Sequence, residues 1–225
     1  TRVISFGDSL SDMGNIEDAP ISNGPVWIDQ LSRNHLELDS SVASSKGGLN
    51  YAYAGASTGD VSDELDPPSA AQQIELFAQA GGSFAADDLV TLWIGGNDFL
   101  NDPENPTPPA TLSGRYDAIL RRLIALGARN IMWGLLPDPG QLHPYIGSNN
   151  RATYSAYAIS VNDNIRALEN TIESAYPDVA ITLFDYHSLQ AQIIQDPAAY
   201  GVSDPRIAIP DGTDLSTAFL MPDGV

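Results

Sequence analysis

Short apolar runs alternate with helical segments along this 225-residue chain, and this alternation constrains the fold more than any other feature. The runs that predict β-strands are Val3–Phe6, Leu49–Ala54, Asp88–Ile94, Asn130–Leu136 and Val179–Phe184. Helices are predicted between and after them, at Pro25–Leu36, Ala70–Ala80, Ser113–Leu126, Ala152–Ala175 and Leu189–Ile194. Strands that alternate with helices form a parallel sheet covered by helices on both faces.

The expected fold is therefore of the α/β class. Five strands favour a three-layer αβα sandwich with a flavodoxin-like parallel sheet in the strand order 2-1-3-4-5, an order taken from fold precedent. The length fits a single domain over residues 1–225, and no internal repeat is evident. The final stretch, from residue 196 onward, is rich in Pro, Asp and Gly and is expected to be irregular.

The charge balance excludes several kinds of partner. Acidic residues number 29 and basic residues 10, which gives a net charge of −19. Nucleic acid and anionic membrane surfaces are therefore not expected to bind, because both require clustered Lys and Arg. No apolar run is long enough for a membrane span, and no signal sequence is recognisable, so we expect a secreted protein whose signal has been removed. The chain has no cysteine, which rules out disulfides and cysteine-bound metals.

Three predicted strands end in small or polar residues that suit acyl transfer. Ser9 follows the first strand, Gly55 the second and Asn97 the third. In the expected order these strands are neighbours, about 5 Å apart per step. A serine nucleophile needs donors that stabilise the oxyanion it creates, and backbone N–H groups and an amide side chain can supply them.

The motifs around these residues resemble those of a known family. The segments F-G-D-S-L-S-D-M-G-N at 6–15, N-Y-A-Y-A-G-A at 50–56 and W-I-G-G-N-D at 93–98 are similar to three successive blocks of the GDSL, or SGNH, hydrolases. G-A-R-N-I before the fourth strand and D-P-A-A-Y-G at 196–201 resemble stretches of the secreted bacterial esterase and lipase members. These segments span nearly the whole chain in the order that the family shows.

The resemblance implies a carboxylic ester hydrolase with Ser9 as nucleophile and no metal or cofactor. Its own N–H, the N–H of Gly55 and the side chain of Asn97 would form the oxyanion hole. Asp223 matches the Asp of the last family block, whose His would fall one position past Val225, so the chain is expected to be cut just before it. The acids and amides around the motifs are expected to hold turns: Asp8, Asp12, Asn15 and Asp98.

The three internal histidines are alternative bases. His35 lies late in the first helix, where it suits the helix C-terminus. His187 follows the fifth strand, which is about 14 Å from the first in the expected order, too far for direct proton transfer. His143 lies in a loop that could bend over the site, where we expect it to line the pocket rather than act as base.

Two other functions compete with the esterase. A hydrolase-derived module that lacks a base would bind an acylated sugar or lipid without turnover. A phosphate- or flavin-binding protein would share the fold, but the acids around Ser9 would repel phosphate.

The ester substrate could be a small molecule, a polysaccharide ester or a lipid. With no evident lid helix, short or soluble esters are favoured. The oligomeric state is left open. Apolar residues of the loops at 99–112 and 137–150 either contact the acyl chain or pack the loops onto the sheet: Phe99, Leu142, Tyr145 and Ile146.

Overall fold

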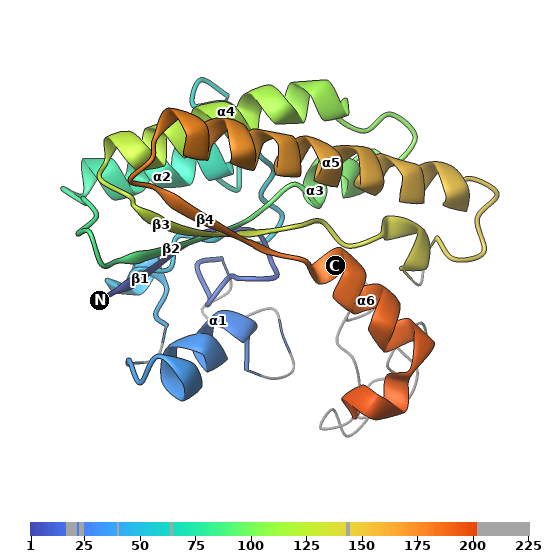
Figure 1. The fold of residues 1–225 in the computed structure, drawn as a ribbon, viewed down its shortest axis with the longest axis horizontal. Coiled ribbons are helices and arrows are strands. Elements are labelled where there is room, and N and C mark those ends of the chain that lie inside the picture. The colour runs from blue at the N-terminus through green and yellow to red at the C-terminus, as the bar shows by residue number, and fades with distance from the viewer. Residues whose placement is uncertain (17–21, 23–24, 40, 64, 143–144, 202–225) are drawn as a thin grey trace.

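The computed structural model in Figure 1 describes residues 1–16, 22, 25–39, 41–63, 65–142 and 145–201. Its strands are β1 (Val3–Gly7), β2 (Leu89–Trp93), β3 (Asn130–Gly134) and β4 (Ala180–Phe184). Its α-helices are α1 (Trp27–Gln30), α2 (Ala70–Gln79), α3 (Asn97–Leu100), α4 (Pro109–Ala125), α5 (Arg151–Ala175) and α6 (Tyr186–Gln195). A π-helical turn, Leu31–His35, continues α1, and 3-10 turns lie at Ser44–Lys46, Pro139–Gln141 and Pro197–Tyr200.

The four strands form one parallel sheet in the order β1-β2-β3-β4. Helices α2, α4 and α5 lie on one side of it, and α1 and α6 lie on the other (Figure 1). The predicted three-layer α/β sandwich with a parallel sheet is confirmed. All four strands end at the same edge, where the motif residues follow β1 and β2.

The predicted second strand, Leu49–Ala54, does not form a strand of the sheet. It lies beside β1, where the order 2-1-3-4-5 puts it, but it forms only an isolated bridge between Asn50 and Ser5. Ser5 N donates to Leu49 O at 3.1 Å, and Tyr51 N donates to Ser5 O at 2.7 Å. The next rung would be donated by Gly7 N, but this N–H donates to Gln73 Oε1 at 2.9 Å instead, so the ladder does not continue. The sheet of the described residues thus has four strands rather than five.

The main core lies between the sheet and helices α2, α4 and α5. Alternate strand residues face it and are at most 1% exposed: Ile4, Phe6, Val90, Leu92, Ile131 and Trp133. Tyr116 of α4 packs edge-on against Trp133, with ring centroids 5.1 Å apart. The other face of the sheet is more polar, and there Thr91 donates through its hydroxyl to Ser5 Oγ at 2.9 Å.

The helix ends follow the local sequence. A capping box begins α2, because Ser69 Oγ accepts from Gln72 N and the Gln72 side chain accepts from Ser69 N. Helix α4 begins at Pro109, four residues before the predicted start, because proline is well suited to the first helical position. None of the helices in the described part of the chain has the length and apolar character that crossing a membrane requires.

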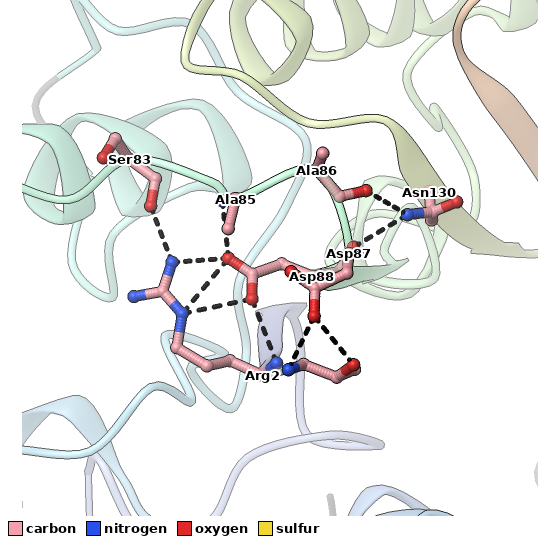
Figure 2. A network of polar contacts seen from close by, with 8 residues as sticks. Arg2, Ser83, Ala85, Ala86, Asp87, Asp88 and Asn130 are labelled. Atoms are coloured by element: carbon pink, nitrogen blue, oxygen red, sulfur yellow. Dashed lines mark hydrogen bonds and ion pairs between the residues drawn. The ribbon is translucent and has the colours of Figure 1, made fainter.

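An ion pair ties the N-terminus to the start of β2 (Figure 2). The Asp88 carboxylate is 1% exposed and accepts from the Arg2 guanidinium, from Arg2 N at 3.0 Å and from Ala85 N at 2.7 Å. Burial raises the pKa of Asp88, but these hydrogen bonds outweigh it and hold the pKa below its ordinary value. The Arg2 side chain also donates to Ser83 O at 2.9 Å, so it fixes the turn that precedes β2.

We predict that Arg2→Ala lowers the free energy of unfolding at neutral pH. The loss should be about 1–2 kcal/mol, less than for a fully buried pair, because Arg2 itself is 46% exposed. Since the pKa of Asp88 is lowered in the fold, the difference should shrink as the pH falls below about 4. Urea unfolding at several pH values measures it. Arg33→Ala, which breaks an exposed pair with Asp29, is the control and should cause little change at any pH; an equal loss in both variants would contradict the assignment.

Candidate active site

The Ser9 turn begins where β1 ends. Gly7 is the last strand residue, and any side chain there would collide with the carbonyl oxygen of Trp93 on β2. The chain then makes a helical turn, in which Ser11 N and Asp12 N both donate to Asp8 O at 3.0 Å. Ser9 is half-buried in this turn, at the carboxyl edge of the sheet. This is the edge at which open α/β sheets bind their ligands.

Asp12 and Asn15 fasten the turn to the 50–56 segment. One Asp12 oxygen accepts from Gly14 N and Asn15 N at 2.8 and 2.7 Å, and the other accepts from Ala54 N at 2.9 Å. The Asn15 amide donates to Asn50 O and Ala52 O at 2.9 and 2.8 Å. Both residues therefore hold backbone, as the sequence predicted.

Gly55 lies immediately after this fastened segment. Its φ of +78° is a left-handed conformation that glycine adopts without strain, and the residue is exposed at the rim. Tyr53 N donates to Gly7 O at 3.1 Å, so the segment reaches the Gly55 turn alongside the end of β1.

Asn97 joins the third motif to the same place. Its Nδ2 donates to Ala56 O at 2.8 Å, and the side chain is 9% exposed. This bond uses one of the two N–H groups of the amide, and the second has no hydrogen-bond partner among the residues that the structure describes. The structure therefore brings together the segments of Ser9, Gly55 and Asn97, whereas Asp223 lies outside the described residues.

A buried polar network lies beneath Asn97. The Asp98 carboxylate accepts from Thr58 N at 2.8 Å, from Thr58 Oγ1 at 2.7 Å and from Arg115 at 3.1 Å. Burial raises the pKa of Asp98, and these hydrogen bonds and the charge of Arg115 oppose the increase. The network holds α3 and the 56–58 segment against α4, and so it supports the Asn97 side chain from behind.

Asp8, the residue before Ser9, is 3% exposed. One carboxylate oxygen accepts from Leu10 N at 3.1 Å, and the other lies beside Gly96, 3.6 Å from where a Cβ would stand on that glycine. Burial raises the pKa of Asp8 to about 7, with a further increase from the negative charge of Asp98. The carboxyl thus titrates near neutral pH at the contact between the first and third motifs.

The described histidines do not form an acid–base pair with Ser9. His35 is exposed on the π-helical turn, and His143 lies outside the described residues. His187 is in α6, which follows β4, three strands away from β1. The preceding Asp185 accepts from Ser188 N at 2.9 Å and pairs with Arg166 at 3.1 Å, so it caps α6 rather than orienting His187.

Phe99, one of the loop residues considered for substrate contact, packs the loop onto the protein. Phe99 is 2% exposed and packs against Tyr145, Tyr154 and Tyr157, with ring centroids 4.9–5.7 Å apart. Its role is therefore to pack the loop.

The sequence analysis did not single out a second aromatic group, which includes Trp93 and Phe184. These are the last or nearly last residues of their predicted strands. Their place at strand ends was the available signal.

The fold is a three-layer α/β sandwich with the Ser9 turn at the carboxyl edge of its parallel sheet. The chain matches the family GDSL-like Lipase/Acylhydrolase over residues 3–225, and it belongs to that family. The predicted membership is confirmed, and the family supports an enzyme of the esterase or lipase type.

Two relatives are each 28% identical to the chain. One is the phosphatidylcholine-sterol acyltransferase of Aeromonas hydrophila, matched over 95% of this chain and 66% of that protein. The other is the thermolabile hemolysin of Vibrio parahaemolyticus, matched over 92% of this chain and 51% of that protein. The chain thus spans about two thirds of the first relative and about half of the second.

Two solved structures share the fold. A lipolytic protein of the G-D-S-L family from Veillonella parvula has a TM-score of 0.56 at 16% identity, covering 86% of this chain and 82% of that one. LAE5, an alpha/beta hydrolase enzyme from the metagenome of Lake Arreo, has a TM-score of 0.57 at 15% identity, covering 92% and 86%.

We predict that Asp8→Asn removes a pH-dependent loss of stability. Because the pKa of Asp8 is raised to about 7 in the fold, wild-type stability from this group is present in acid and is lost as the pH rises toward 7. The amide stays neutral and can still accept from Leu10 N. Urea unfolding should show the variant gaining on wild type between pH 5 and pH 8, on the order of 2 kcal/mol. A difference that does not change with pH would contradict the assignment.

Proposed function

We propose that this chain carries the active site of a carboxylic ester hydrolase with Ser9 as the nucleophile. One observation supports this most: hydrogen bonds join the three motif segments at one edge of the sheet, from Tyr53 N to Gly7 O and from Asn97 Nδ2 to Ala56 O. A serine next to converging backbone and amide donors suits acyl transfer, because the reaction creates an oxyanion that such donors stabilise.

In the proposed reaction, Ser9 Oγ attacks the ester carbonyl and its proton passes to a histidine oriented by Asp223. The carbonyl oxygen becomes an oxyanion that accepts hydrogen bonds from Ser9 N, Gly55 N and the free N–H of Asn97. Collapse of the tetrahedral intermediate expels the alcohol, which takes the proton from the histidine. Water then hydrolyses the acyl-enzyme by the same steps, so that Ser9 is regenerated and the acid is released.

The relatives favour a lipid ester as the substrate. One is a phosphatidylcholine-sterol acyltransferase and the other a thermolabile hemolysin, and both match nearly the whole of this chain. We therefore extend the sequence-based preference for short or soluble esters to acyl esters of lipids, with water as the acyl acceptor.

We predict that Ser9→Ala abolishes hydrolysis of aryl and lipid esters by the protein as its gene encodes it. Asn97→Ala should lower kcat by about 10²–10³, because an oxyanion donor acts mainly in the transition state, and should change KM little. Initial rates measure both effects. Ser174→Ala, an exposed serine of α5, is the control and should leave the rate unchanged.

Full activity in Ser9→Ala would contradict the mechanism. Saturable binding of acyl esters without Ser9-dependent turnover would instead favour the binding module described above.

A further inference from the structure

A row of four residues crosses the sheet at its carboxyl edge. Gly7 of β1 is in register with Trp93 of β2, and Gly134 of β3 with Phe184 of β4. The pairing of Leu92 with Trp133 places Trp93 next to Gly134. Residues in register on parallel strands point to the same face, so two aromatic side chains alternate here with two glycines.

The glycine between the two aromatic residues is what lets them meet. A Cβ on Gly134 would collide with the Trp93 indole, so this ring lies directly over the backbone of β3. From there it reaches Phe184, with ring centroids 5.6 Å apart, and Tyr186 at the start of α6, at 5.0 Å.

Helix α1, which lies on this face of the sheet (Figure 1), adds the side chain of Trp27. The Trp27 ring lies 5.9 Å from Trp93 and 6.3 Å from Phe184, to which it is nearly parallel at 17°. We call Trp27, Trp93, Phe184 and Tyr186 the aromatic cluster. Both indole N–H groups are engaged: Trp93 Nε1 donates to Leu135 O at 3.1 Å, and Trp27 Nε1 donates to Ser11 Oγ at 3.1 Å.

The bond to Ser11 connects the cluster to the turn that carries the nucleophile. Ser11 is two residues beyond Ser9, a span of about 7 Å at most. The cluster therefore contacts the Ser9 turn two residues from the nucleophile.

The cluster is less buried than the largest aromatic side chains of the core and of the Phe99 group. Phe6, Trp133 and Phe99 are at most 2% exposed. Trp93 is buried at 6% exposed, but Trp27, Phe184 and Tyr186 are only half-buried, so the cluster has accessible apolar surface at the carboxyl edge of the sheet.

We propose that the aromatic cluster is the subsite for the acyl chain of the ester substrate, an inference that rests on the proposed function. The acyl chain of an ester bound at Ser9 would lie on the accessible parts of Trp27, Phe184 and Tyr186, over the buried Trp93. The cluster offers ring faces and no charged group to this chain, which suits hydrocarbon. Each CH₂ that leaves water for this surface should increase binding about four-fold.

Binding can be tested without turnover, in the 225-residue chain with Ser9→Ala. The probe is the methyl ester of ω-bromodecanoic acid, because bromine quenches tryptophan emission on contact. The emission should be quenched saturably, and Trp27→Phe should remove a large part of the quenching. Trp133→Phe is the matched control: this tryptophan is fully buried on the opposite face of the sheet, so its replacement should leave the quenching in place. Unquenched emission, or equal quenching in the Trp27→Phe variant, would overturn the proposal.

Kinetics in the protein as its gene encodes it separate this subsite from the reaction itself. Trp27→Ala and Phe184→Leu should each lower kcat/KM for decanoate esters about ten-fold relative to acetate esters. Ile159→Ala, a 51% exposed residue of α5, should leave that ratio unchanged. An unchanged ratio in both cluster variants, in proteins with wild-type circular dichroism, would overturn the subsite while leaving the esterase intact. Activity that survives Ser9→Ala would overturn the proposed function, and the quenching result would still decide the subsite.

Discussion

Two side-chain hydrogen bonds hold the site together, and the rest of the account depends on them. Asp12 accepts from Ala54 N, and Asn97 donates to Ala56 O, so the residues on either side of Gly55 are fastened to the first and third motifs. Gly55 itself carries no side chain and takes a left-handed turn between the two anchors. The sheet sets the spacing of β1 and β2, and these two bonds fix the segment on either side of Gly55 against the residues that follow both strands.

The same edge of the sheet concentrates acidic groups out of water. Asp8 and Asp98 are each at most 6% exposed, and burial raises both pKa values. Among the described residues, Asp98 has a cation, Arg115, to compensate it, and Asp8 has none. Such an arrangement costs stability, and its position directly behind Ser9 and Asn97 indicates that geometry at the site is kept at the expense of stability.

Much of this arrangement could be predicted from the sequence. Short apolar runs predicted the strands β1 to β4, since strands of a covered parallel sheet need nearly continuous apolar residues. The meeting of the three motifs could also be predicted, because the carboxyl ends of parallel strands lie at the same edge of the sheet. The failure at residues 49–54 has a specific cause: Gly7 N, which would donate the next rung to this segment, donates to the Gln73 side chain, and no periodicity reveals a hydrogen bond to a distant side chain. The aromatic cluster was missed for a similar reason, because the contact of Trp93 with Phe184 depends on Gly134, a residue of a third strand.

The most direct measurement of the central claim is a crystal structure of the protein, as its gene encodes it, after reaction with a serine-directed alkyl fluorophosphonate. The account predicts an adduct on Ser9 whose phosphoryl oxygen lies about 3 Å from Gly55 N and from Asn97 Nδ2, as an oxyanion would. It also predicts that the alkyl group lies against Trp27 and Phe184. An adduct on another residue, or a phosphoryl oxygen on Ser9 turned away from both donors, would contradict the account.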